Sequence, residues 1–416
     1  MKHALAPVAA LLIGVSILLT GQGLQGTLLP VRASLEDFST FSIAVIGAAY
    51  FLGFTLGCLK GGQLVKRVGH VRAFLAMTAL ASATPLIHGL ILNPLAWGLL
   101  RLVTGCCFAV LYVVIESWIN ERTSNENRGV VFSTYVMITL TVLAAGQMMT
   151  LLYDPSGLEL FLVASVLVSL GAIPVALSKS QTPEKPQDVD VNLRRLFRIS
   201  PTGTIGSLAT GMANGAFWSL APVFTAAISN DASRAAWFMA STVIGGALAQ
   251  WPLGLLSDKV GRRKTMFGAA SVSALFAALI VVFVDQLGFV GINLLGAAWG
   301  FFAFPIYAIS VAHANDYADS SDYVMVSSGL LLMYGIGAII GPFAASAAMA
   351  ISGVSGLYLL TGFVHALLAV YAVQRIARRT SAPVEEHIAF GDALATAHTA
   401  SQVYEEEILH QAEDET

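Results

Sequence analysis

Charged residues are scarce in this chain. Asp, Glu, Lys and Arg together make up 11% of the 416 residues, whereas an average soluble domain is about 25% charged. Hydrophobic residues account for 56% of the chain, and the mean hydropathy is +0.74. Because so few charges cannot cover the surface of a water-soluble globule, this composition excludes an ordinary soluble protein.

Cysteine and the common catalytic signatures are also scarce or missing. The three cysteines, Cys58, Cys106 and Cys107, fall in apolar runs without metal-ligand spacing, which excludes a disulfide framework. The sequence has no metal-spaced His and Glu, no G-x-S-x-G, no paired intramembrane carboxylates and no Walker-type glycine loop. We therefore expect no enzyme activity, no metal or cofactor, no direct use of ATP and no nucleic-acid partner.

Long apolar runs dominate the chain instead. A bilayer core about 30 Å thick needs roughly 20 apolar residues per helix. The predicted spans are residues 7–29, 41–63, 73–92, 95–117, 130–152, 158–178, 202–226, 235–256, 265–284, 287–311, 324–349 and 354–374. The first run continues to Pro30 without a small-x-small cleavage site, so we do not expect a removable signal peptide. The sequence predicts an all-α integral membrane protein with twelve transmembrane helices.

Basic residues are distributed unevenly over the connections between these spans. The odd-numbered connections carry Arg32 and Arg234 and no Lys. Every other Lys and Arg lies on or next to an even-numbered connection or near a chain end, except Arg101, which falls well within the fourth predicted span. By the positive-inside rule, both termini and all even-numbered connections are predicted to be cytoplasmic.

A polar cassette occurs twice between apolar runs, as GGQLVKRVGHVRAF (residues 61–74) and as GLLSDKVGRRKTMF (residues 254–267). A shift of 192 residues aligns, without gaps, Gly53 with Gly245, Gly62 with Gly254, Leu64 with Leu256, Arg67 with Lys259, Gly69 with Gly261, His70 with Arg262 and Arg72 with Lys264. This register predicts two parallel six-helix repeats. The predicted units are a bundle at 1–178, a polar cytoplasmic linker at 179–200, a second bundle at 201–379 and a solvated acidic tail at 380–416.

Three signatures carry a family resemblance. The second cassette fits the pattern G-x-L-x-D-[RK]-x-G-[RK]-[RK] completely, whereas the first has Lys66 in place of Asp and His70 in place of a basic residue. RLVTGCCFA fits R-x-x-x-G-x-x-x-A through Arg101, and NENRG supplies an Arg-Gly pair before the fifth span. Across all twelve spans the chain resembles the major facilitator superfamily. The strings GHVRAF and VVIESWINERTSNENRG are most similar to its bacterial YcaD-like branch.

The resemblance implies alternating access, in which the cassettes close the cytoplasmic side. The predicted gate residues are Gly62, Lys66, Arg67, Gly69, Glu116, Arg128, Gly254, Asp258, Lys259, Gly261, Arg262 and Arg263. Lys66 cannot make the carboxylate contact of Asp258, so we hypothesise that it pairs with Glu116, Glu121 or Glu126. For Glu116, proton coupling is the alternative to a gate salt bridge.

Polar and aromatic groups within the spans predict a substrate site. Arg101 lies about 10 Å inside the fourth span, where a charge costs roughly 3 kcal/mol and is usually functional. The alternatives are snorkelling to the outer interface and a purely structural pairing. The resemblance implies that helices 1, 4, 7 and 10 line the cavity, and the repeat register places Asn293 opposite Arg101. The predicted substrate-binding residues are Arg101, Gln22, Gln25, Asn214, Trp218, Asn293 and Trp299.

These observations together predict a secondary transporter in the bacterial inner membrane. We expect a monomer that takes up a small neutral or weakly anionic organic solute, with protons as a candidate coupling ion. A planar ring could stack on Trp218 or Trp299, which makes a vitamin such as riboflavin one candidate. Proton-coupled efflux is an alternative, although the fifth span lacks the Gly-Pro motif of many drug antiporters. A non-transporting membrane receptor is the other alternative.

Overall fold

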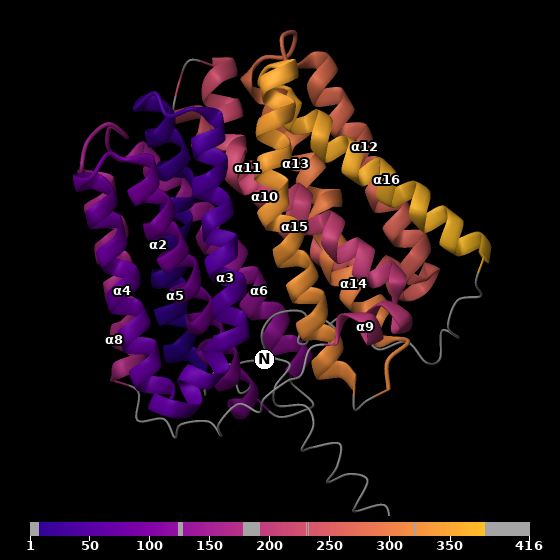
Figure 1. The fold of residues 1–416 in the computed structure, drawn as a ribbon, viewed down its shortest axis with the longest axis horizontal. Helices are drawn as coiled ribbons and strands as arrows, with labels where there is room; N and C mark the ends of the chain where they lie inside the picture. The colour runs from indigo at the N-terminus through magenta and orange to yellow at the C-terminus, as the bar shows by residue number, and fades with distance from the viewer. Residues whose placement is uncertain are drawn as a thin grey trace, which may run out of the picture.

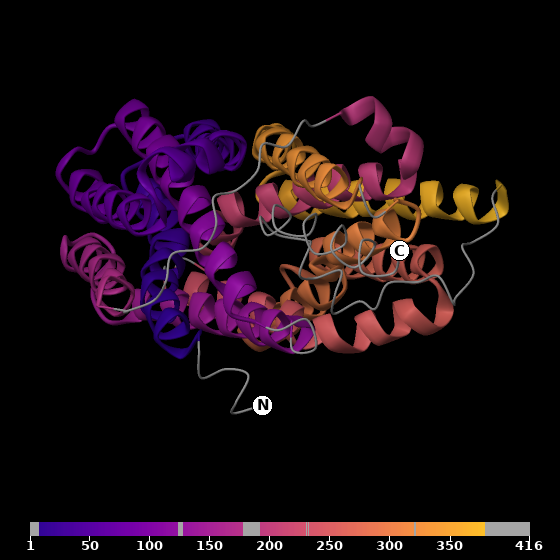
Figure 2. The same ribbon diagram turned by 90° about the horizontal axis from the view of Figure 1, so that it is seen from below.

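The computed structural model describes residues 8–123, 128–177, 192–229, 231, 233–319 and 322–378, and these residues form a bundle of helices. The helices of the N-terminal half are α2 (Ala9–Leu35), α3 (Thr40–Val68), α4 (His70–Leu90), α5 (Pro94–Arg122), α6 (Arg128–Met148), the short η3 (Met149–Leu151), α7 (Glu159–Leu170) and α8 (Ala172–Ala176). Figure 1 shows this half, in indigo and purple, beside the C-terminal half, and Figure 2 shows the same separation from below.

The C-terminal half repeats this sequence of long helices. Its elements are α9 (Leu193–Ile199), α10 (Pro201–Ser229), α11 (Ser233–Val260), α12 (Arg262–Phe283), α13 (Phe289–Ala303), α14 (Pro305–Asn315), α15 (Tyr323–Ser352) and α16 (Gly356–Arg378). Among the described residues, 11 helices are long and apolar enough to cross a membrane. The remaining predicted span is α10, which has 29 residues and packs against α14, α15 and α16. The predicted all-α fold is confirmed.

The two cassettes form helix ends rather than extended loops. α3 continues through Lys66 to Val68, and α11 continues through Asp258 to Val260. The chain then turns at Gly69, with a φ of 87°, and at Gly261, with a φ of 101°. Glycine adopts this region at no steric cost, whereas a Cβ makes it unfavourable. The aligned glycines therefore make the same tight turn in each half, and we call this end of the bundle the cassette end.

The two halves are joined mainly at the end opposite the cassettes. One hydrophobic cluster there contains residues of both halves, such as Leu28 and Ile43 with Phe217 and Phe224. A second mixed cluster joins Ala144 of α6 to α11. Toward the cassette end, by contrast, the clusters of buried residues stay within one half. The structure is thus closed by apolar packing at one end and has separate cores at the other.

Part of the predicted linker is helical, which the sequence analysis did not anticipate. α9 occupies residues 193–199 of the predicted linker at 179–200. The Asn192 side chain caps this helix by accepting from the Arg195 backbone N–H at 3.0 Å. The predicted acidic tail, residues 380–416, lies outside the described residues, as does Glu126.

Glycines allow α3 and α5 to pack with their backbones in contact. A Cβ at Gly53 would collide with the backbone carbonyl of Leu102, and a Cβ at Gly105 would collide with that of Tyr50. The equivalent contact in the other half places Gly245 of α11 against the carbonyl of Ala297 on α13. Small residues bring membrane helices close enough for van der Waals packing, which replaces the hydrophobic driving force available in water.

We predict that Gly105→Ala destabilises the protein, because the new methyl group has no space and must push α3 and α5 apart. Overpacking of this kind costs about 1–3 kcal/mol, which thermal unfolding in detergent would register as a lower melting temperature. Gly98→Ala on the same helix is the matched control, since a Cβ there meets nothing within 4 Å. Equal melting temperatures for the two variants would contradict the proposed role of Gly105.

Candidate functional site

A cavity of about 370 Å³ lies between the two halves. Small-molecule sites typically have volumes of about 300–1,000 Å³, so this cavity has the size of a metabolite site. Helices α2, α3, α5 and α6 line it from one half, and α10, α11, α14 and α15 line it from the other. Its polar lining consists of Gln22, Tyr50, Thr55, Arg101, Tyr112, Glu116, Tyr135, Thr139, Gln147, Asn214, Ser219, Gln250, Tyr307, Ser328 and Tyr334.

Arg101 is the cationic side chain of this lining. Its guanidinium carbon lies 4.2 Å from the centre of the Tyr50 ring, which is a cation–π contact. In the described part of the chain, no carboxylate forms a salt bridge with Arg101. The packing of Gly105 against the Tyr50 carbonyl fixes the two helices that carry this pair. The positive charge of Arg101 is therefore stabilised by the Tyr50 ring and not by a paired carboxylate.

A chain of polar contacts extends from Tyr50 toward the cassette end. The Gln22 amide donates from Nε2 to the Tyr50 hydroxyl at 2.6 Å. The Tyr112 hydroxyl donates to Oε1 of the same glutamine at 3.3 Å. Gln22 thus bridges α3 and α5 from α2, and it orients both tyrosines within the lining.

Glu116 lies one turn beyond Tyr112 on α5 and also lines the cavity. The residue is fully buried, and its carboxylate is close enough to the hydroxyls of Tyr112, Tyr135 and Tyr307 to interact with them electrostatically. A buried carboxylate among hydroxyl groups can be stabilised by hydrogen bonds when it is charged or when it is protonated.

The C-terminal half contributes aromatic and amide groups. The Trp218 ring stacks on Phe304 with a centroid distance of 6.0 Å and an interplanar angle of 13°. Asn214, one turn before Trp218 on α10, donates to the Tyr334 hydroxyl at 3.4 Å. The Tyr334 ring in turn packs against Tyr307 at 5.0 Å. This wall of the cavity offers flat apolar faces with hydroxyl and amide edges.

The structure brings four of the predicted substrate residues to this cavity and leaves three outside its lining. Gln22, Arg101, Asn214 and Trp218 line it, whereas Gln25, Asn293 and Trp299 do not. Gln25 is buried one helical turn further along α2. The α2 residues of the lining are Gln22, Gly23, Gly26, Leu29, Pro30 and Ala33. At about 100° per residue, the centre of this stripe lies about 100° from Gln25 around the helix axis, so Gln25 points away from the cavity.

Asn293 and Trp299 lie outside the lining, on the part of the tenth span that precedes the residues that reach the cavity. This span divides into α13 and α14 at Phe304–Pro305, and its contributions to the lining are Phe304, Tyr307 and Ala308. Asn293 lies earlier, on α13, where its Nδ2 donates to the Phe289 carbonyl at 2.7 Å and its Oδ1 accepts from Ser241 at 3.2 Å. The structure therefore does not place Asn293 across the cavity from Arg101.

Trp299 is completely buried in an aromatic cluster of the C-terminal half. Its ring centroid lies 5.3 Å from that of Phe217, 5.7 Å from that of Tyr358 and 5.9 Å from that of His365. In the described structure, Trp299 therefore packs within the protein and does not contact the cavity.

The sequence analysis missed the five tyrosines of the lining. These residues are Tyr50, Tyr112, Tyr135, Tyr307 and Tyr334. Tyrosines in membrane proteins are enriched at the two lipid–water interfaces. All five fall within predicted spans, and a mid-span position of this residue type is a signal that could have identified them.

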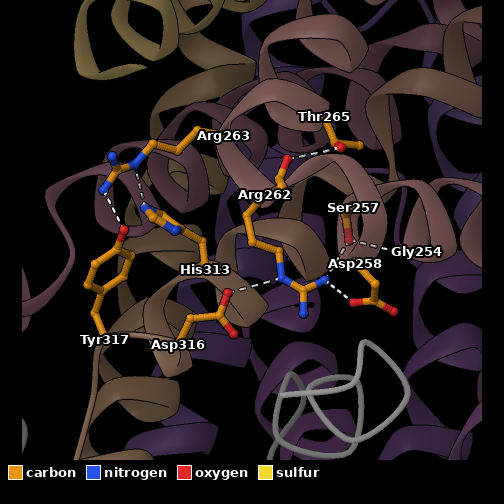
Figure 3. Close-up of polar contacts among 10 residues, drawn as sticks. Gly254, Ser257, Asp258, Arg262, Arg263, Thr265, His313, Asp316 and Tyr317 are labelled. Carbon is orange, nitrogen blue, oxygen red and sulfur yellow. Dashed lines mark hydrogen bonds and ion pairs between the residues drawn. The ribbon is translucent and has the colours of Figure 1, made fainter. Parts of the chain in front are cut away.

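The second cassette forms an ionic cluster at the cassette end of the C-terminal half (Figure 3). Arg262 pairs with Asp258 one turn earlier, and its Nε donates to Asp316 at the end of α14 at 3.1 Å. The side chains of Arg262 and Asp316 are each 1% exposed. Arg262 Nη1 also donates to the Ser257 hydroxyl at 2.6 Å. These contacts fasten the α11–α12 turn to α14.

Arg263 makes a second connection between the same elements. Its Nη2 donates to the Tyr317 hydroxyl at 2.9 Å, and its Nε donates to His313 Nε2 at 3.4 Å (Figure 3). Gly254 is buried in the same region, and Lys259 is exposed. Asp258, Arg262 and Arg263 therefore connect the α11–α12 turn with α14.

The first cassette has different residues at the corresponding positions, with Lys66 where the second has Asp258 and His70 where it has Arg262. Gly62 is buried near the end of α3, while Arg67 is exposed and Gly69 makes the turn. α3 and α5 are in register such that Gly57 contacts residue 106 and Gly61 contacts Val110, a constant difference of 49 positions. The same difference takes Lys66 to the level of residue 115, the position next to Glu116 on α5. The Arg128 side chain lies outside the described part of the structure.

Comparison with known proteins identifies the family. The family model of the Major Facilitator Superfamily matches residues 11–202 and residues 203–403. The chain therefore belongs to the Major Facilitator Superfamily of membrane transporters, with the helical bundle that the sequence predicts. It is similar to the "uncharacterized MFS-type transporter YcaD" of Escherichia fergusonii, with 26% identity over 380 residues that cover 91% of this chain and 98% of the relative.

Two solved structures share the fold. The nucleoside transporter NupG has a TM-score of 0.76 at 14% identity, and the similarity covers 89% of this chain and 99% of NupG. A bacterial homologue of the human lysosomal transporter Spinster has a TM-score of 0.71 at 15% identity, and the similarity covers 92% of this chain and 98% of the homologue.

We predict that Arg262→Gln strongly destabilises the C-terminal half, because Asp316 then stays buried without its guanidinium partner. Removal of one member of a buried ion pair costs about 3–5 kcal/mol. Thermal unfolding in detergent should show a large loss, and adding Asp316→Asn should recover part of it. Lys259→Gln removes an exposed charge of the same cassette and is the control. A melting temperature for Arg262→Gln no lower than that of this control would rule out a stabilising role for the cluster.

Proposed function

We propose that the protein is a secondary active transporter that moves a small organic solute through the central cavity by alternating access. The observation that carries this proposal is the cavity between the halves, in which Arg101 and Glu116 line one continuous space. Membership of a superfamily of membrane transporters supports a transport function for this chain. The apolar closure at one end and the separate cores at the other support a cycle in which the two halves rock about the site.

The substrate class follows from the lining. Arg101 offers five N–H donors and a positive charge without a protein anion to occupy them. The tyrosine hydroxyls and the amides of Gln22 and Asn214 offer further hydrogen bonds, and the Trp218–Phe304 pair offers a flat apolar face. These groups suit a neutral or weakly anionic molecule with a planar ring. Nucleosides, which NupG is named for, and planar vitamins such as riboflavin share this chemistry.

The proposed direction is uptake. The positive-inside distribution of Lys and Arg supports an orientation with the cassette end in the cytoplasm. With this orientation, the end that has separate cores faces the cytoplasm, and a solute in the cavity would be released there. The ionic cluster of Asp258 and Arg262 would then close this side in the opposite state of the cycle, together with the first cassette.

We predict that Arg101→Lys folds and inserts normally while transport falls at least tenfold. Lysine keeps the positive charge but loses the planar donor geometry and the stacking on Tyr50. The measurements are solute flux in vesicles and the shift in melting temperature that a metabolite panel produces with the purified protein. Any metabolite that stabilises the native protein should stabilise Arg101→Lys much less.

Arg234→Lys is the matched control for this substitution. Arg234 also makes a cation–π contact, 5.1 Å from the centre of the Phe289 ring, but it does not line the cavity. Its replacement should leave flux and ligand stabilisation unchanged. Transport at the native level in both Arg101→Lys and Arg101→Ala would place this residue outside the mechanism.

We predict that Glu116→Gln retains solute exchange between vesicle compartments but loses accumulation driven by a pH gradient. The amide matches the size of the protonated carboxyl group and, like it, has both a hydrogen-bond donor and an acceptor, but it cannot release a proton. If the variant binds solute and fails to exchange it, Glu116 acts in the gate instead. In that case the double variant Lys66→Glu, Glu116→Lys should restore exchange, because it re-forms an ion pair at the level where α3 and α5 bring these positions together.

A further inference from the structure

The short helix α9 has a surface that the transport mechanism does not use. Figure 1 places it at the lower end of the C-terminal half, and Figure 2 shows it at the outer edge of that half. It has the sequence LRRLFRI and is followed at Ser200 and Pro201 by the start of α10. The Gly203 backbone N–H donates to the Ser200 hydroxyl at 3.0 Å, which begins α10 as a separate helix.

One side of α9 is fastened to the C-terminal half. Leu196 is completely buried in a cluster with residues of α14 and α15, and it fills the space that a side chain at Gly329 would need. Arg195 Nη2 pairs with Asp322 Oδ2 at 2.7 Å, just before α15 begins. A seven-residue helix is too short to be stable by itself in water. These two contacts therefore fix both its position and its rotation.

The remaining surface of α9 is exposed and carries two pairs of side chains, an apolar pair beside Leu196 and a basic pair opposite it. Leu193 and Phe197 are one turn apart and are 36% and 49% exposed. Arg194 and Arg198 are also one turn apart and exposed, and neither forms a salt bridge with a described residue. Since each residue advances about 100° around the axis, the apolar pair and the basic pair form adjacent stripes.

This pattern matches the boundary between acyl chains and headgroups in a bilayer. Interfacial helices combine an apolar face with Lys or Arg on the polar face, and anionic lipids strengthen their binding. Arginine binds phosphate oxygens through two parallel N–H donors. α9 directly precedes α10, one of the predicted spans. It therefore lies at the end of the membrane-spanning bundle, where lipid headgroups lie.

We propose that α9 is a binding site for an anionic phospholipid of the surrounding leaflet. Arg194 and Arg198 hold the headgroup phosphate, and Leu193 and Phe197 lie against the first segments of its acyl chains. The bound lipid anchors the start of the C-terminal half at the membrane surface. This site is separate from the central cavity and does not depend on the identity of the solute.

The test measures lipid binding to the purified full-length protein in a neutral detergent. Native mass spectrometry and thermal unfolding follow a titration with phosphatidylglycerol, and phosphatidylcholine with the same acyl chains is the comparison. The double variant Arg194→Gln, Arg198→Gln should bind phosphatidylglycerol about 30-fold more weakly, from the usual contribution of two arginines near an anionic surface. Its affinity for phosphatidylcholine should be unchanged.

Two further variants test whether lipid binding is specific to α9. Arg72→Gln, Lys264→Gln removes two exposed basic residues near the cassette turns and should retain native binding. Leu193→Ser, Phe197→Ser should weaken the binding of long-chain phosphatidylglycerol, because it removes the acyl-chain contact. Equal losses in both charge variants would overturn the proposal in favour of unspecific attraction. Stabilisation of the native protein by inorganic phosphate to the same degree as by the lipid would overturn it as well.

Discussion

Close contact between helix backbones is the interaction on which the rest of this structure depends. Inside a bilayer every backbone N–H and C=O must be paired within the protein, so the spans are helices. Apolar side chains gain little by leaving lipid for protein, and the helices must instead be held by tight van der Waals packing. At Gly53 and Gly105, α3 and α5 reach this packing, and Gly245 does the same for α11 in the other half. Because the same helices line the cavity, these contacts set the geometry of its walls.

The two halves share an architecture but differ in chemistry. Both charged groups of the cavity, Arg101 and Glu116, come from α5 of the N-terminal half. The C-terminal half supplies aromatic rings and amides to the cavity, and its own charges form the buried cluster of Arg262 and Asp316 at the helix ends. Duplication therefore conserved the backbone path, and the functional groups were distributed unequally between the copies.

Sequence reasoning located the spans, the repeat and the cassette turns, and the reason is physical. Lipid imposes a length and an apolar composition on every span, and a turn with positive φ favours glycine at positions 69 and 261. Rotation about a helix axis is set by contacts with neighbouring helices, which one sequence does not display. This is why the sequence does not distinguish Gln22, which lines the cavity, from Gln25 and Trp299, which do not. α9 went unnoticed because three arginines in seven residues resemble a polar linker.

The position of Arg101 late in the N-terminal half also bears on the order of assembly. Membrane proteins are synthesised from the N-terminus, and N-terminal segments fold first. Tyr50 on α3, and the glycine surface to which α5 docks, are made before Arg101 leaves the ribosome. The aromatic partner of the guanidinium has thus already been synthesised when Arg101 enters the bilayer. A chain with α3 and α5 exchanged would contain the same residues, but it would have to insert an unaccompanied charge.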